Sequence, residues 1–187
     1  MRKQAINLFP KEPWIRNKKE QNRMIWTTGL IVLFLLMMLF FIIPHFFPAA
    51  TYHSRAFKGF FKNFGSLARI LVFFVFAHYV LSFILRKKYV DRWIAKLKPV
   101  VITFSRWARQ WHVPAAITVF GLVVIHAVCA FLYGWRWDWS NMTGLLALLC
   151  LVPIAVTGFM RYKKLDRKWH FRLGIGFAVL FILHAFL

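Results

Sequence analysis

Five of the seven histidines in this sequence fall in or at the ends of long apolar segments, where ionisable side chains are costly and usually functional. Four of these five repeat one frame. Trp111-His112 is followed after thirteen residues by His126-Ala127, and Trp169-His170 is followed after thirteen residues by His184-Ala185. Fourteen residues of α-helix rise about 21 Å and complete nearly four turns, so each pair lies on one face of its helix at two depths.

The spacing of the four histidines predicts two stacked imidazole pairs. One apolar segment separates the two histidine-bearing segments, so they run parallel and their histidines lie at matching levels. A pair of imidazoles facing each other is the axial ligation of low-spin b-type haem. We therefore expect two non-covalently bound haems b, with His112 and His170 on the inner iron and His126 and His184 on the outer iron.

Small and basic residues near the first histidine of each pair fit this interpretation. Ala116 and Gly174 follow it by one turn on the same face and would leave room for the inner macrocycle. Arg172 is a candidate partner for the propionates of that macrocycle. Gly121 and Gly176 lie off the histidine face, so we expect them to serve helix packing.

Other functions of the histidines remain open at this point. Zinc or copper also binds imidazole, but such sites usually recruit carboxylates or thiolates, and the five acidic residues all lie in tails or loops. A transporter or channel with a histidine-lined proton or metal path is the alternative function, and a non-catalytic anchoring subunit is another. His78 has no partner at the fourteen-residue spacing, so we expect no particular role for it by default; contact with a haem edge or a quinone is the alternative.

The elements that carry the histidines are predicted to be membrane-spanning helices. Of the 187 residues, 60% are hydrophobic and 19% aromatic, which is typical of an all-α integral membrane protein. Five apolar segments are long enough to cross a bilayer as helices. They cover about 24–43, 66–85, 112–132, 143–160 and 170–187.

The distribution of basic residues predicts the orientation. Seven Lys and Arg residues precede the first segment, eight lie between 86 and 111, and five between 161 and 168, whereas the alternate connections hold three and one. The positive-inside rule then puts a basic tail, 1–23, in the cytoplasm and the C-terminus of the membrane domain, 24–187, outside. Residues 89–110 suit an amphipathic segment on the inner surface, and an ordinary basic loop is the alternative. The net charge of +21 is membrane-flanking charge, and we expect no nucleic-acid partner.

The chain resembles the di-haem b-type membrane cytochromes, in particular the ferric reductase-like transmembrane domain and the flavinylation-associated cytochromes. The resemblance rests on Trp111-His112, His126, Lys168-Trp169-His170 and His184, and it covers roughly the last 40% of the chain. It implies that these four histidines bind an inner and an outer haem. The sequence departs from the ferric reductases in ending just after His184, without a flavin and nicotinamide-binding module.

These observations predict an oxidoreductase component that relays electrons across a bacterial cytoplasmic membrane and lacks its own NAD(P)H-binding module. The expected donor is a quinol or a redox partner protein, and an extracytoplasmic flavoprotein is a candidate partner on the outer side.

Overall fold

The computed structural model describes residues 15, 17–87, 95–161 and 168–186, and these residues form helices and no strand. The principal helices are α1 (Lys18–Met37), α2 (Ile43–Phe46), α3 (Arg55–Arg86), α5 (Lys98–Tyr133), α6 (Trp139–Met160) and α7 (Trp169–Phe186). A π-helical turn at Met38–Ile42 joins α1 to α2, so that these two form a single apolar span. The described residues thus contain five helices long and apolar enough to cross a membrane, which confirms the predicted all-α membrane architecture.

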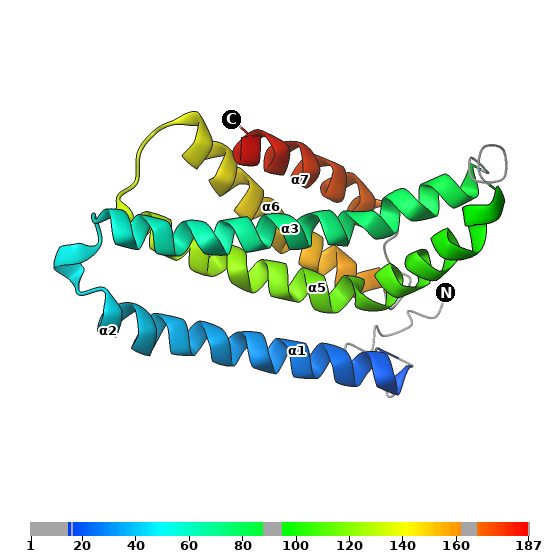
Figure 1. The fold of residues 1–187 in the computed structure, drawn as a ribbon, viewed down its shortest axis with the longest axis horizontal. Helices are drawn as coiled ribbons and strands as arrows, with labels where there is room; N and C mark the ends of the chain where they lie inside the picture. The colour runs from blue at the N-terminus through cyan, green and yellow to red at the C-terminus, as the bar shows by residue number, and fades with distance from the viewer. Residues whose placement is uncertain (1–14, 16, 88–94, 162–167, 187) are drawn as a thin grey trace, which may run out of the picture.

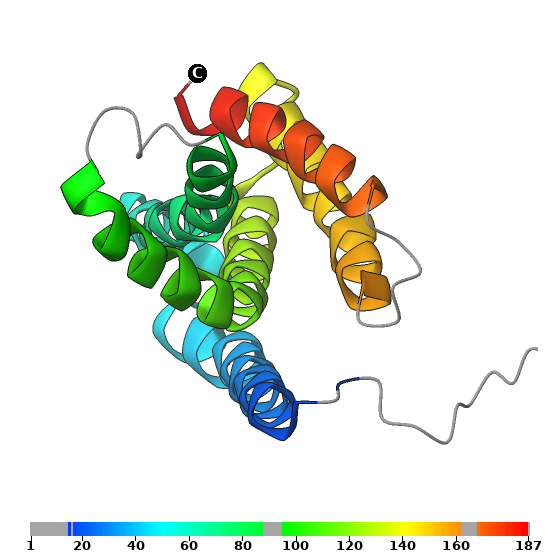
Figure 2. The same cartoon turned by 90° about the vertical axis from the view of Figure 1, so that its right-hand side faces the viewer.

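The five spans run back and forth, so α1 begins at one end of the bundle and α7 finishes toward the other (Figure 1). α3 packs chiefly against α5, and α6 chiefly against α7. Figure 2 shows α6 and α7 as a pair beside the pair formed by α3 and α5. In both pairs the second helix carries the repeated histidine frame, so the two histidine-bearing helices run parallel.

The helices extend beyond the apolar segments that predicted them. α3 begins at Arg55, where the Ser54 hydroxyl accepts a hydrogen bond from the Phe57 N–H at 3.1 Å, and α6 begins after Asp138, which caps the Asn141 N–H at 2.8 Å. α5 ends at Gly134, whose φ of +122° suits a residue without a side chain. Apolar runs mark the lipid-embedded part of a helix, whereas caps determine its true ends.

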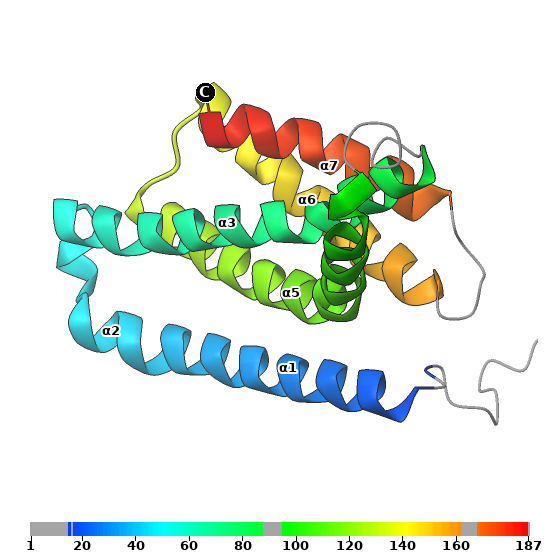
Figure 3. The ribbon, with the colours of Figure 1, turned by 45° about the vertical axis from the view of Figure 1, so that its right-hand side comes forward.

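The predicted amphipathic segment, 89–110, falls partly outside the described residues. From Lys98 onward it is the first part of α5 and is continuous with the membrane span. Figure 3 shows this first part turned away from the rest of α5. Pro114 lies inside the helix, where the missing N–H and the proline ring disrupt the preceding turn and favour a bend.

α5 is the central helix of the bundle. In its apolar window 28% of residues are buried, against 6% to 11% in the other spans, whose side chains mostly face outward as expected for contact with lipid. One core cluster joins α5 to α1, α2 and α3. A second joins it to α3, α6 and α7, and its buried members are Val72, Val119, Ala147, Phe177 and Phe181. α5 therefore sets the position of every other span.

The two glycines expected to serve helix packing differ. A Cβ on Gly121 would lie 2.5 Å from Cγ2 of Ile31, so this glycine lets α1 approach α5 closely. Around Gly176 no atom lies within 4 Å of the corresponding point, and the residue is exposed. The expectation is met at Gly121 and wrong at Gly176, because the α7 face that carries Gly176 meets no other helix.

We predict that Gly121→Ala lowers the stability of the protein by about 1–3 kcal/mol, because the added methyl overpacks the contact with Ile31. Adding Ile31→Ala should restore much of the loss by removing the opposing Cγ2. The measurement is thermal unfolding of the purified protein in detergent, with Gly176→Ala as the matched control. Equal stability of the two glycine variants would contradict the prediction.

Candidate paired-histidine site

The four repeated histidines come from the two parallel helices α5 and α7, and their rings line two cavities between the helix pairs. His126 and His184 line a cavity of about 560 Å³ that reaches the connection between α5 and α6. His112 and His170 line a smaller cavity of about 190 Å³. Val72 and Phe177 line both cavities, so the two spaces are stacked along the bundle with a shared wall.

The rings of His126 and His184 face each other at a distance that suits one shared metal ion. Their centroids are 6.2 Å apart and their planes are inclined by 66°. Metal–imidazole bonds of about 2 Å on opposite sides of one ion would put the two centroids about 6 Å apart. The observed separation of the two centroids is therefore close to that expected for two imidazoles on opposite sides of one ion.

Each of the four histidines is held through Nδ1 by a backbone carbonyl of the neighbouring helix. His126 bonds to the Phe61 oxygen at 3.0 Å and His112 to the Val75 oxygen at 3.2 Å, both on α3. On α6, the Ser140 oxygen lies 2.8 Å from Nδ1 of His184, and the Ile154 oxygen 3.1 Å from Nδ1 of His170. Because a carbonyl only accepts, each Nδ1 carries the proton and the lone pair of the neutral ring is on Nε2. This is the outer-shell arrangement usual for histidines that bind metals.

The carbonyl acceptors repeat the spacing of the histidines. Phe61 and Val75 are fourteen residues apart on α3, and Ser140 and Ile154 are fourteen apart on α6. Each histidine-bearing helix thus meets its partner in the same register at both levels. The two helix pairs, α3 with α5 and α6 with α7, are built alike.

Glycines make room for three of the rings. A Cβ on Gly65 would lie 2.9 Å from the ring of His126, one on Gly144 2.7 Å from that of His184, and one on Gly158 3.1 Å from that of His170. Each of these glycines stands four residues after the carbonyl that holds the same ring, one helical turn along. At the fourth position the aromatic ring of Tyr79 packs edge-on against His112, with centroids 5.4 Å apart.

The sequence analysis missed these residues of α3 and α6. Their signal is present in the sequence: Gly65 and Gly144 both open a Gly-x-Leu-Ala tetrad, and Gly144 precedes Gly158 by the same fourteen residues that separate the histidines. The tetrads end in Ala68 and Ala147, which are buried at 4% and 8% relative exposure. The fourteen-residue spacing therefore indicates Gly144 and Gly158, and the tetrad shared with Gly144 indicates Gly65.

The other predicted site residues lie as follows. Ala116 and Gly174 both line the smaller cavity with His112 and His170, and no atom lies within 4 Å of a Cβ placed on Gly174. Arg172 is exposed, and its guanidinium lies over the Trp169 ring, 5.4 Å from the centroid.

His78 lies next to the smaller cavity on α3. Its ring centroid is 5.7 Å from that of His112, and its Nδ1 is buried without a hydrogen-bond partner among the described residues. Nδ1 of His78 thus lacks the carbonyl partner that holds Nδ1 of each of the four repeated histidines.

Among the described residues, the repeated histidines that could bind a metal come together as pairs. No group of three or more His, Cys, Asp or Glu side chains in the described ranges could hold a metal ion. Structural zinc sites use four protein ligands and catalytic zinc sites use three. Two opposed imidazoles fit a metal whose other positions are filled by a macrocycle, and the 560 Å³ cavity lies within the range of about 300–1,000 Å³ usual for bound organic groups.

Comparisons with protein-family models, with curated proteins and with solved structures found no match to this chain.

We predict that Gly144→Ala destabilises the protein by about 1–3 kcal/mol, because the new methyl group would force the His184 ring away from the Ser140 carbonyl. Gly65→Ala should act in the same way on His126. Thermal unfolding in detergent measures the effect, again beside Gly176→Ala. If Gly144→Ala unfolds at the same temperature as Gly176→Ala, the close approach of α6 to the His184 ring is wrong.

Proposed function

We propose that this chain is a membrane b-type cytochrome of the di-haem kind that relays electrons across the bilayer. The observation that carries the proposal is the pair His126 and His184, with opposed rings at 6.2 Å, Nδ1 atoms held by carbonyls and a cavity between the helix pairs. When bound, haem would supply one-electron redox chemistry.

The residues of the chain would act as fixed ligands in this function. The four Nδ1 bonds orient the imidazoles before any group binds. Nε2 of His126 and His184 would then hold one iron, and Nε2 of His112 and His170 would hold the other. Between the two levels lies an apolar wall that includes Val72 and Phe177. The apolar surroundings would keep water away from both sites and contribute to the redox potentials of groups bound there.

The proposed function requires an electron donor and an electron acceptor at the two membrane surfaces. A quinol or a redox partner protein would donate electrons at one membrane surface, and a partner such as an extracytoplasmic flavoprotein would exchange them at the other. The location would be a bacterial cytoplasmic membrane, with the basic N-terminal tail inside and the end of α7 outside.

We predict two b-type haems per chain, measured by the absorption spectra of the oxidised and dithionite-reduced protein and by the pyridine haemochrome assay. His126→Ala or His184→Ala should remove one haem, and His112→Ala or His170→Ala the other, because a bis-histidine iron loses an axial ligand in each case. His45→Ala, an exposed histidine beyond the repeated frame, is the control and should retain both. A haem-free protein from haem-replete cells would overturn the proposal and favour the transporter alternative.

We predict that a cysteine at Trp137, which is 82% exposed in the connection between α5 and α6, reacts with a membrane-impermeant thiol reagent in intact cells. A cysteine at Lys87, exposed after α3 at the opposite end of the bundle, should react only after the cells are opened. The unmodified chain, whose two cysteines lie within the spans, gives the background. The reverse labelling pattern would invert the proposed orientation and the side on which each partner acts.

A further inference from the structure

Arg69 is a cation within a membrane span. It lies in the middle of α3, four residues after Gly65 and three before Val72, and all three residues line the 560 Å³ cavity. An arginine at such a position is costly in a bilayer and usually marks a functional site with a specific partner. The partner has to be identified from the groups around the cavity.

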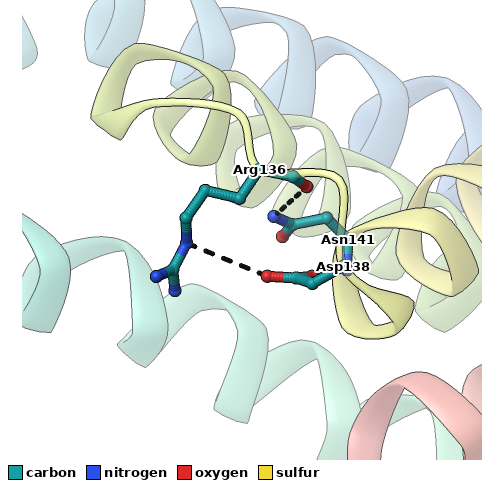
Figure 4. Close-up of polar contacts among 3 residues, drawn as sticks. All are labelled: Arg136, Asp138 and Asn141. Carbon is teal, nitrogen blue, oxygen red and sulfur yellow. Dashed lines mark hydrogen bonds and ion pairs between the residues drawn. The ribbon is translucent and has the colours of Figure 1, made fainter.

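Among the described residues, Arg69 has no carboxylate partner. The sequence has five acidic residues, and none falls between the bounds of α3, α5, α6 or α7. The one acid lining the cavity, Asp138, is already paired with Arg136, whose Nε lies 3.8 Å from the Asp138 carboxylate (Figure 4). Arg69 itself contacts the ring of Phe186, with Cζ 5.5 Å from the centroid. A cation–π contact leaves guanidinium donors available for an oxyanion.

The cavity carries an excess of positive charge. Lys58, Lys62, Arg69 and Arg136 line it, against Asp138 alone, so four cations less one anion leave +3 among the described lining residues. Three of these cations follow one another along α3 at spacings of four and seven residues, which keeps them on one helix face. They stand on the same helix as Phe61 and Gly65, the two residues that position His126.

The contact of Arg69 places its side chain near the end of α7 that carries His184. Its contact residue, Phe186, follows His184 by two residues on α7, so the guanidinium lies at the edge between α3 and α7, and Arg69 lines the same cavity as His126 and His184. Side chains on a helix lean toward its N-terminus, which directs Arg69 toward the end of the bundle that carries Lys62 and Lys58.

We propose that Arg69, together with Lys62, binds the propionate carboxylates of a tetrapyrrole in the outer cavity and thereby fixes its orientation. The inference rests on the proposed function. Arginine binds a carboxylate through two parallel hydrogen bonds, and the low dielectric of the membrane strengthens the pair. The carboxylates would point to the edge between α3 and α7, with the apolar side of the macrocycle toward Val72 and Phe177. A phospholipid phosphate is the other source of an oxyanion at this edge.

The test compares protohaem with its dimethyl ester, in which both propionates are uncharged. The full-length chain carrying His170→Ala, which leaves one complete histidine pair, is purified without haem and titrated with each compound by absorption of the bis-histidine complex. We expect the ester to bind at least about tenfold more weakly, because it loses the charge-assisted hydrogen bonds that the two carboxylates would accept. If the two compounds bind with equal affinity to the chain that retains Arg69, the inference is overturned.

Variants then assign the effect to Arg69. In Arg69→Gln the preference for protohaem over the ester should fall toward one, and Arg69→Lys should keep part of it because the charge remains. Arg86→Gln is the matched control: it removes an arginine from the other end of α3, where Nε bonds to the Ser82 carbonyl, and should keep the full preference. An unchanged preference in Arg69→Gln overturns the inference.

The lipid source gives a different result. If Arg69 binds a phospholipid, added phosphatidylglycerol will raise the unfolding temperature of the haem-free chain more than that of Arg69→Gln, and the preference for protohaem will be the same in both. That outcome overturns the carboxylate assignment. If neither compound forms a bis-histidine complex with any variant, the proposed function itself fails.

Discussion

The hydrogen bond from each histidine Nδ1 to a backbone carbonyl is the interaction on which the site depends. A helix carbonyl is already engaged in its own helix, so a ring from a second helix reaches it only where the two backbones approach closely. Gly65, Gly144 and Gly158 permit that approach at three of the four positions. The bond and the missing side chain therefore act together. One sets the tautomer and the direction of the ring, and the other supplies the space that the ring occupies.

The same constraint explains why the bundle consists of two similar helix pairs. α3 holds the histidines of α5 at two levels, and α6 holds those of α7 at the same two levels. On each of the four helices, the two carbonyls or the two histidines are fourteen residues apart. Because that spacing is close to a whole number of helical turns, both levels share one helix face. Each pair must therefore keep one register over the fourteen residues between its two levels, and the apolar cluster around Val72 and Phe177 lies between the levels.

A charged side chain within a membrane span is costly, so the charged residues of the site need partners. In water an exposed arginine beside a cavity would need no partner. In a span without acids, Arg69 packs on the Phe186 ring and has no carboxylate partner among the described residues. The positive-inside rule considers basic residues in the connections between spans, and Arg69 lies within a span. Its function becomes visible only when the cavity, the paired Asp138 and the neighbouring lysines are considered together.

The sequence by itself determined the helical class, the five spans and the levels of the histidines along α5 and α7, because rise and rotation per residue are properties of the backbone and need no tertiary contact. Only the tertiary structure decided which carbonyls hold the rings, that His126 and His184 lie 6.2 Å apart, and that Gly121 packs closely while Gly176 does not. Those distances lie between helices, and they depend on the side chains that separate one helix from the next.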